Sequence, residues 1–134
     1  MSDYRIYSFE KLEVYHEALD LCVKIYGIVV NFPKEEQYDL VRQIKRAMSG
    51  VTANLAEGSG RASGDDQARF TNMAYASVLE VINHFNLAVK LRYLDPNTHT
   101  QLRLSFDKII NQLNALYKYQ INNEQTLKKR VKKG

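Results

Sequence analysis

Apolar residues recur every three or four positions through four separate segments of this 134-residue chain, and this periodicity is the strongest constraint on its fold. Such spacing places apolar side chains on one face of an α-helix, whereas a β-strand would show strict alternation. The chain holds only two prolines and six glycines, so few positions interrupt a helix. The pattern therefore predicts an all-α fold of amphipathic helices.

Helix-terminating residues divide the pattern into four helices. Pro33 ends or opens a helix, because proline is tolerated only in the first turn. Ser63 is a good N-cap, and Asp95 followed by Pro96 supplies an N-cap and a first helical residue. The expected helices cover about residues 9–32, 34–58, 64–93 and 96–121. Short connections then predict an antiparallel up-down-up-down four-helix bundle over residues 1–123, followed by a flexible basic tail over residues 124–134.

The same spacing predicts which residues face the core. In the first helix these are Leu12, Tyr15, Leu19, Cys22, Tyr26 and Val29. In the second they are Leu40, Ile44, Ala47, Met48, Val51 and Leu55. In the third, Phe70, Ala74, Val78, Val81, Ile82, Phe85, Ala88 and Val89 fill about half the circumference, which predicts that this helix is the most buried or serves two interfaces. In the fourth they are Leu102, Phe106, Ile109, Leu113 and Leu116.

The stretch NLAEGSGRASGDD, residues 54–66, is the one glycine-rich segment. A phosphate-binding P-loop follows a strand and ends in Gly-Lys-Ser/Thr, and this stretch has neither feature. We interpret it as the corner between the second and third helices. Gly58 or Gly60 is expected to close the second helix in the left-handed conformation.

Candidate catalytic and metal-binding residues do not form a recognisable set. Glu80 and His84 are four residues apart, whereas di-iron bundles use Glu-x-x-His pairs on two helices. Cys22 lies on the expected core face and is interpreted as a small buried hydrophobe. We therefore expect no enzymatic activity, no metal and no cofactor. A single cysteine, the absence of an apolar leader and the lack of a membrane-length apolar run predict a cytoplasmic protein that does not enter a membrane.

A polar line follows the second helix beside its apolar face and consists of Gln43, Arg46, Gly50, Asn54, Glu57 and Arg61. A matching flank on the third helix holds Arg69, Ser77, Glu80 and His84. Glycine in such a line would let another backbone approach closely. Two interpretations stay open: a solvated face with ordinary i, i+4 pairs, or a hydrogen-bonded seam between helices or between subunits.

Basic residues suggest a phosphate-binding surface. The tail holds five basic residues and one acidic residue, so it accounts for the whole net charge of +4 and leaves residues 1–123 balanced. Arg42, Lys45 and Arg46 add a cluster on the second helix. Such groups are either ordinary surface charges or contacts for nucleic-acid phosphates. The basic residues of the tail are Lys128, Lys129, Arg130, Lys132 and Lys133.

Three segments resemble a known family: FEKLEVYHEALDL (residues 9–21), LVRQIKRAMSGVTANLAEGSGR (residues 40–61) and RFTNMAYASVLEV (residues 69–81). The family comprises four-helix-bundle proteins encoded by intervening sequences inside bacterial large-subunit ribosomal RNA genes. The resemblance covers about residues 9–121 and implies a ring-like homopentamer. It also implies a relation to the accessory proteins of diversity-generating retroelements, which are basic pentamers that bind nucleic acid and a reverse transcriptase. The signature positions would be Asn54, Glu57, Arg61, Arg69, Phe70 and Glu80, which we infer hold helices and subunits together.

These observations predict a non-enzymatic, homo-oligomeric helical bundle that binds nucleic acid, RNA or an RNA–DNA hybrid, without reading its sequence. The predicted phosphate contacts are the cluster on the second helix and the basic tail. The alternative is a scaffold that binds another protein, such as a reverse transcriptase or a ribonucleoprotein component, and uses its charges only to stay dissolved.

Overall fold

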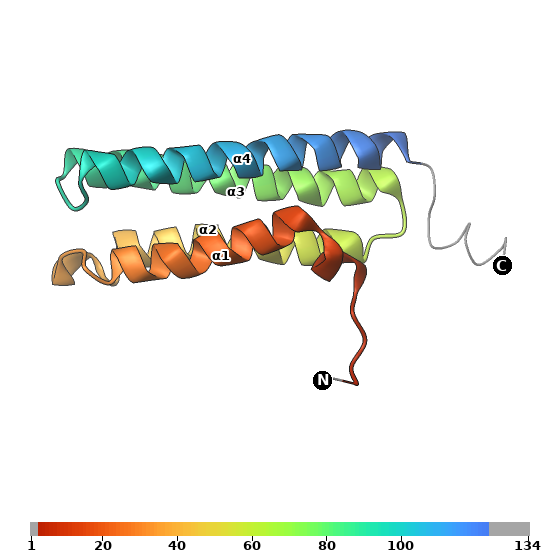
Figure 1. Ribbon diagram of the computed structural model, residues 1–134, viewed down its shortest axis with the longest axis horizontal. Helices are drawn as coiled ribbons and strands as arrows, with labels where there is room; N and C mark the ends of the chain where they lie inside the picture. The colour runs from red at the N-terminus through yellow and green to blue at the C-terminus, as the bar shows by residue number, and fades with distance from the viewer. Residues whose placement is uncertain (1–2, 124–134) are drawn as a thin grey trace, which may run out of the picture.

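The computed structural model describes residues 3–123, which form four α-helices, two short 3-10 helices and no strand. The elements are η1 (Ser8–Lys11), α1 (Glu13–Val29), η2 (Lys34–Glu36), α2 (Leu40–Ser59), α3 (Gly64–Lys90) and α4 (Pro96–Asn122). The long helices lie side by side, with the α1–α2 and α3–α4 connections at one end and the α2–α3 corner at the other (Figure 1). The all-α, four-helix prediction is confirmed. The predicted basic tail lies outside the described residues.

The α3 helix is the centre of the bundle. It has its most extensive contacts with α2 and the next most extensive with α4, whereas α1 and α4 touch only sparsely. Phe85 on α3 and Phe106 on α4 are the largest fully buried side chains. Ten residues of α3 are buried, more than in any other helix. The wide apolar arc predicted for the third helix is therefore explained, because that helix packs against a neighbour on each side.

The inward face of α1 differs from the prediction. The buried residues are Val14, Ala18, Leu21, Ile25 and Val29. Val29 was predicted and is buried, whereas the other four lie on a line with helical spacing about 100° around the helix from the expected one. Small aliphatic side chains fill the core, whereas a buried tyrosine hydroxyl would need a hydrogen-bond partner. Tyr15 and Cys22 accordingly lie half-buried at the margin, and Tyr26, which was predicted to be core, is 42% exposed.

The first helix begins later than predicted. Residues 8–11 form η1, and Leu12 then adopts an extended conformation with φ −76° and ψ 127°, so α1 starts at Glu13 and not at residue 9. The ring of Phe9 meets that of Tyr15 edge to face, with 5.0 Å between centroids. This contact folds η1 back against α1, which a continuous helix would not allow.

The second helix also begins later than predicted, at Leu40 and not at residue 34. The preceding segment contains η2 and a side-chain cap. The Gln37 carboxamide donates hydrogen bonds to the carbonyl oxygens of Val29, at 3.2 Å, and Phe32, at 3.1 Å. The Val29 carbonyl belongs to the last residue of α1 and the Phe32 carbonyl lies just beyond the helix, where backbone acceptors lack intrahelical partners. Residues 33–39 therefore form a capped connection instead of the first turns of a helix.

Glycines at the α2–α3 corner serve close packing and not an unusual backbone conformation. Gly60 has φ −85° and ψ −3°, so the predicted left-handed closure is wrong. A Cβ atom on Gly58 would lie 2.6 Å from Cβ of Phe70. A Cβ atom on Gly64 would overlap the carbonyl oxygens of Gln120 and Asn123. The corner can close only because these positions carry no side chain.

Two predicted caps are confirmed. The Ser63 hydroxyl oxygen accepts a hydrogen bond from the Asp66 backbone N–H at 3.1 Å. The Asp95 carboxylate accepts one from the Thr98 N–H at 2.8 Å, with Pro96 at the first helical position. Each bond satisfies a donor that the first turn of a helix leaves free. Both connections next to α3 are thus fixed by local side-chain chemistry.

The packing at Gly64 predicts opposite effects for two glycine-to-alanine substitutions. Gly64→Ala should lower the free energy of unfolding by about 1–3 kcal/mol, because the new methyl group has no room against the end of α4. Gly27→Ala should raise it by about 0.5–1 kcal/mol, because Gly27 lies inside α1 with open space around it. Urea unfolding followed by circular dichroism measures both free energies. A Gly64→Ala protein with the same free energy of unfolding as the wild type would contradict the close packing of Gly64 against the end of α4.

Candidate functional site

A cluster of exposed cations and tyrosines lies where α1 and α2 meet the connection between them. We define the basic–aromatic patch as Tyr26, Tyr38, Arg42, Lys45 and Arg46. The Lys45 ammonium lies 4.7 Å from the ring centroid of Tyr26. The guanidinium carbon of Arg42 lies 5.8 Å from the ring centroid of Tyr38, which is 77% exposed. Tyrosine faces attract cations at such distances, so these contacts hold the charges beside aromatic rings that remain accessible.

The cations of the basic–aromatic patch have no carboxylate within ion-pair distance among residues 3–123. Lys108 and Arg69 are paired instead, at 2.7 Å from Glu17 and 2.9 Å from Asp66. Other exposed lysines such as Lys24 and Lys118 are also unpaired among residues 3–123, but only the patch gathers three cations within residues 42–46. A paired cation offers less net charge to an external anion than an unpaired one. The patch is therefore a place where the described surface can receive phosphate groups.

Of the predicted phosphate contacts, Arg42, Lys45 and Arg46 lie together on α2. The basic residues 128–133 lie outside the described residues. The described chain ends with α4 at the end of the bundle opposite to the start of α2, where Arg42 lies (Figure 1). Tyr38 was not singled out from the sequence, although it precedes Arg42 by four positions. Its neighbour Tyr26 was assigned to the core.

The polar line on α2 comes close to α3 at one position. A Cβ atom on Gly50 would lie 3.2 Å from the Ser77 hydroxyl oxygen, so a side chain of α3, and not a backbone, packs against this glycine. Asn54 bonds within its own helix, because its carboxamide donates to the Gly50 carbonyl at 2.8 Å. Gln43 is exposed. The middle of the line thus combines helix packing with local hydrogen bonds.

A charged network surrounds Phe70 at the α2–α3 corner. Arg61 lies 3.3 Å from the Glu57 carboxylate and 3.9 Å from that of Asp66, which also pairs with Arg69. The guanidinium carbons of Arg61 and Arg69 lie 4.5 and 5.5 Å from the Phe70 ring centroid. The predicted signature residues of this region are therefore brought together within one subunit, where they join the end of α2 to the start of α3.

The remaining candidates form no larger constellation. Glu80 lies 3.4 Å from the buried His84, one turn away on α3. Among residues 3–123, no group of three or more His, Cys, Asp and Glu side chains is arranged to hold a metal ion. Burial raises the pKa of the Cys22 thiol, which lowers its thiolate fraction at neutral pH. No helix in the described part of the chain combines the length and apolar character needed to cross a bilayer.

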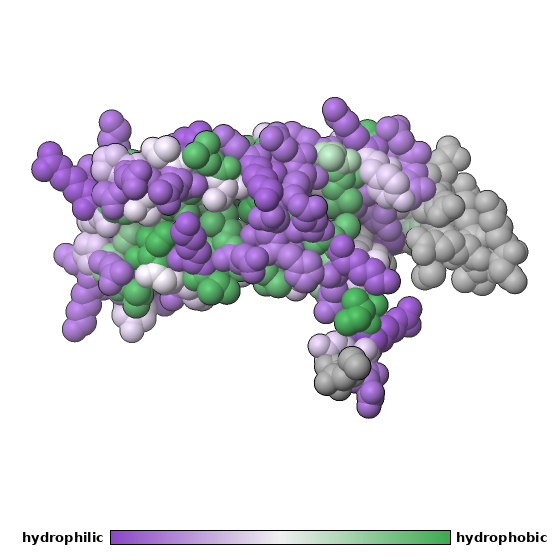
Figure 2. Space-filling view, viewed as in Figure 1, coloured by the Kyte–Doolittle hydropathy of each residue, from purple (hydrophilic) through white to green (hydrophobic). Residues whose placement is uncertain are grey.

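The face that α1 and α4 present is mostly hydrophilic. Figure 2 shows an apolar area between these helices, toward the end where α1 leads into α2. Elsewhere on this face the two helices are linked by polar groups, including the Lys108–Glu17 pair and a 3.2 Å hydrogen bond from the Gln112 carboxamide to Glu13. Lys108 is already paired, and Lys24 shares a groove on this face with Glu17 and Asp20, so this face is a weaker candidate for phosphate binding.

The corner network predicts a local stabilising role for Arg61. Arg61→Ala should lower the free energy of unfolding by about 1 kcal/mol, since it removes an aromatic stack and two partly exposed carboxylate contacts. Arg46→Ala is the matched control, because Arg46 is an exposed α2 arginine without an ion pair, and it should change stability by less than about 0.5 kcal/mol. Thermal unfolding compares them, and equal effects would contradict this role.

Comparison with known proteins places the bundle in a family. The family model described as 23S rRNA-intervening sequence protein matches residues 10–115. A crystal structure of a protein with unknown function from the S23 ribosomal protein family, from Bacteroides thetaiotaomicron, is similar with a TM-score of 0.72 and 20% identity. That alignment covers 78% of this chain and 95% of the other, and it supports the fold alone. No curated protein matches.

Proposed function

Because the chain belongs to the 23S rRNA-intervening sequence protein family, we propose that it is a non-enzymatic, homo-oligomeric bundle that binds nucleic acid through phosphate contacts. The observation that carries the proposal is the basic–aromatic patch, whose cations lack carboxylate partners in the described part of the chain. Arg42, Lys45 and Arg46 would contact phosphates, and the basic residues 128–133 would add further contacts. Phosphate contacts position a protein on nucleic acid without reading sequence.

The tyrosines of the patch bear on the kind of nucleic acid. Tyr38 and Tyr26 expose ring surface next to cations, a combination that suits RNA strands with unstacked bases. Duplex binding would use the cations alone. The proposed ligand is therefore RNA or an RNA–DNA hybrid in the cytoplasm, with single-stranded portions favoured over continuous duplex.

Oligomerisation would raise the affinity for nucleic acid that a patch of three cations can provide. The proposed assembly is a ring-like homopentamer of antiparallel up-down-up-down bundles. Exposed apolar side chains on α3 and directly after its end support a subunit contact: Met73, Leu87 and the C-cap residue Leu91 are each nearly half exposed. Five patches on one ring would engage one strand together, and such multivalency raises avidity without any new contact.

Removal of the patch charges should weaken the salt dependence of binding. In a filter assay with single-stranded RNA, the triple variant Arg42→Gln, Lys45→Gln, Arg46→Gln should lower the slope of log K against log salt by about 2 per bound subunit. The matched control is Arg5→Gln, Lys11→Gln, Lys24→Gln, which removes three exposed basic residues outside the patch and should keep most of the slope.

Deletion of residues 128–133 measures the share of the tail in the same assay. It removes five cations and should lower the slope further than the patch variant does. An unchanged slope after both the patch substitutions and the deletion would contradict phosphate binding by these groups.

The assembly predicts a mass well above that of one chain. Light scattering at micromolar concentration should give about five times the 15.5 kDa subunit mass. Glu57→Gln should reduce that mass more than it reduces helix content. Glu57 is an exposed side chain, and its pair with Arg61 contributes only about 0.3–0.5 kcal/mol to an isolated helix, so the helix itself should persist without it. A monomeric wild-type protein would contradict the oligomer.

A protein-interaction scaffold is the second candidate function. The same exposed apolar side chains on α3 favour it, because they could receive a protein partner such as a reverse transcriptase or a ribonucleoprotein component. Nucleic-acid retention at about 50 mM salt separates the two candidates, since non-specific binding is strongest at low salt. Failure to retain single-stranded RNA, duplex DNA and hybrid would favour the scaffold.

A further inference from the structure

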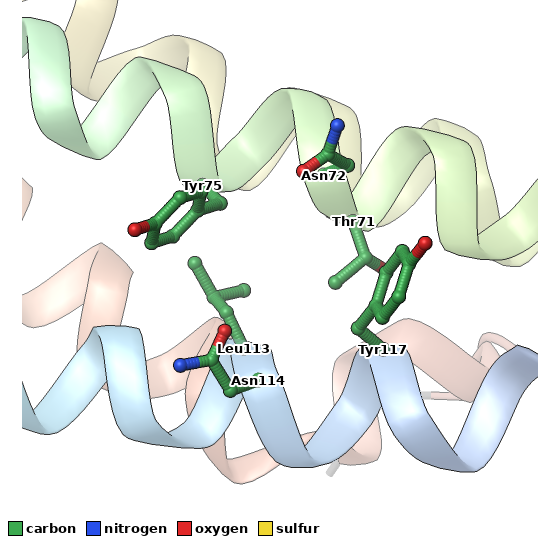
Figure 3. A pocket seen from close by; sticks show the side chains of 6 residues that line it. All are labelled: Thr71, Asn72, Tyr75, Leu113, Asn114 and Tyr117. Carbon is green, nitrogen blue, oxygen red and sulfur yellow. The ribbon is translucent and has the colours of Figure 1, made fainter.

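A groove of about 300 Å³ lies between α3 and α4, near the corner end of the bundle. It is lined by Thr71, Asn72, Tyr75, Leu113, Asn114 and Tyr117. Figure 3 shows Tyr75 reaching from α3 toward α4 and Tyr117 reaching from α4 toward α3, on opposite sides of Leu113. The volume falls at about the lower end of the range of roughly 300–1,000 Å³ typical of small-molecule sites. The groove thus has space for one small planar group between two aromatic walls.

The polar groups of the groove are free to bind a ligand. The carboxamides of Asn72 and Asn114 and the hydroxyls of Tyr75 and Tyr117 have no hydrogen-bond partner within residues 3–123. Thr71 differs, because its hydroxyl donates to the Gln120 side-chain oxygen at 2.5 Å and holds α3 to α4. None of the lining residues is charged, and the buried Leu113 forms an apolar floor.

We propose that this groove binds an unpaired nucleobase of single-stranded RNA, an inference that rests on the proposed nucleic-acid binding. Single-stranded bases are recognised by stacking on aromatic side chains and by hydrogen bonds to their exposed edges. Tyr75 and Tyr117 supply the stacking surfaces. Each carboxamide offers a donor and an acceptor, and asparagine pairs with the donor and acceptor edge of adenine in this way. A base in a duplex has no free face to enter the groove.

Basic residues neighbour the groove on both helices. Lys118 is exposed and follows Asn114 by four residues, one turn along α4. Residues three or four apart are neighbours on a helix surface. Arg69 precedes Asn72 by three residues on α3, but its guanidinium group is already paired with Asp66 at 2.9 Å. Lys118, which has no ion pair among residues 3–123, is therefore the cation beside the neutral groove that can receive a phosphate next to a bound base.

The groove and the basic–aromatic patch can be tested separately. The patch is built on α1, α2 and their connection, whereas the groove is built on α3 and α4. Substitutions in the groove remove no charge, so the salt slope of binding should stay constant while affinity falls. Patch substitutions should therefore change the salt slope of binding, whereas groove substitutions should change the affinity alone.

The test measures fluorescence anisotropy with a 12-nucleotide oligoriboadenylate and with the matching RNA duplex. Tyr117→Leu removes a ring that is 39% exposed while keeping an apolar side chain. Loss of one base–aromatic stack should weaken single-strand binding roughly 5- to 150-fold. Binding of the duplex should change less than about twofold. Tyr75→Leu should act in the same direction.

Matched controls separate stacking from folding. Tyr119→Leu removes an exposed α4 tyrosine outside this groove and should leave single-strand binding unchanged. The double variant Tyr75→Phe, Tyr117→Phe keeps both rings and should retain binding within about threefold. Circular dichroism and light scattering show whether each variant keeps its helix content and mass.

Three results for Tyr117→Leu would overturn the inference. The first is an unchanged affinity for the single strand, and the second is an equal loss of affinity for single strand and duplex. The third is a change of oligomeric mass, which would identify the groove as a contact between copies of the chain. A wild-type protein that retains neither probe contradicts the proposed function. The groove is then judged by NMR with adenosine 5′-monophosphate at millimolar concentration. Shifts of the Asn72 and Asn114 carboxamide signals support a base site, and their absence overturns it.

Discussion

The close packing of α2 against α3 is the constraint on which the rest of the structure depends. The Ser77 side chain packs against Gly50, and the Phe70 side chain packs against Gly58, so the two helices approach closely because α2 carries no side chain at these positions. Phe70 is then enclosed by the guanidinium groups of Arg61 and Arg69. With this pair fixed, α3 becomes the central helix. The α1 helix packs mainly on α2 and the α4 helix mainly on α3, and α1 and α4 touch each other only sparsely.

This arrangement places the candidate functions on the outside of the bundle. The core is filled by aliphatic and phenylalanine side chains, and in the described residues the charged groups lie at its surface. The basic–aromatic patch lies along α1 and α2, and the tyrosine–carboxamide groove lies along α3 and α4. Residues 1–123 carry no net charge, so local arrangement and repetition of these surfaces in an oligomer, more than overall charge, would provide affinity.

The sequence predicted most of the fold, because the second and fourth helices each have a single apolar line and the third has one wide apolar arc. All six expected core residues of α2 are buried, and so are four of the five expected in α4, with Leu116 half-buried. In α1 two lines had helical spacing, and the choice between them depended on where tyrosine hydroxyls could reach water. The break at Leu12 and the cap from Gln37 come from contacts that periodicity does not record. The family resemblance was confirmed because its motifs lie in long uninterrupted segments.

The candidate sites were less predictable, because they join residues that lie far apart in the sequence. Tyr26 meets Lys45 only after α1 and α2 have packed, whereas Tyr38 precedes Arg42 by only four positions and could have been noticed from the sequence. The groove brings Tyr75 and Tyr117 together from two helices. No spacing rule within one helix connects such pairs. The polar line on α2 and its matching flank on α3 were visible in the sequence, but the contact between Gly50 and Ser77 required the fold.

Ultraviolet crosslinking to single-stranded RNA, followed by mass spectrometry of the peptides, tests most directly whether these outer surfaces bind nucleic acid. The account predicts crosslinks at Tyr26 or Tyr38 and at Tyr75 or Tyr117, with none at the half-buried Tyr15. Crosslinks confined to the α1–α4 face around Glu17 and Lys108 would contradict it. The absence of any crosslinked peptide at every RNA concentration at which the protein stays folded would also contradict it.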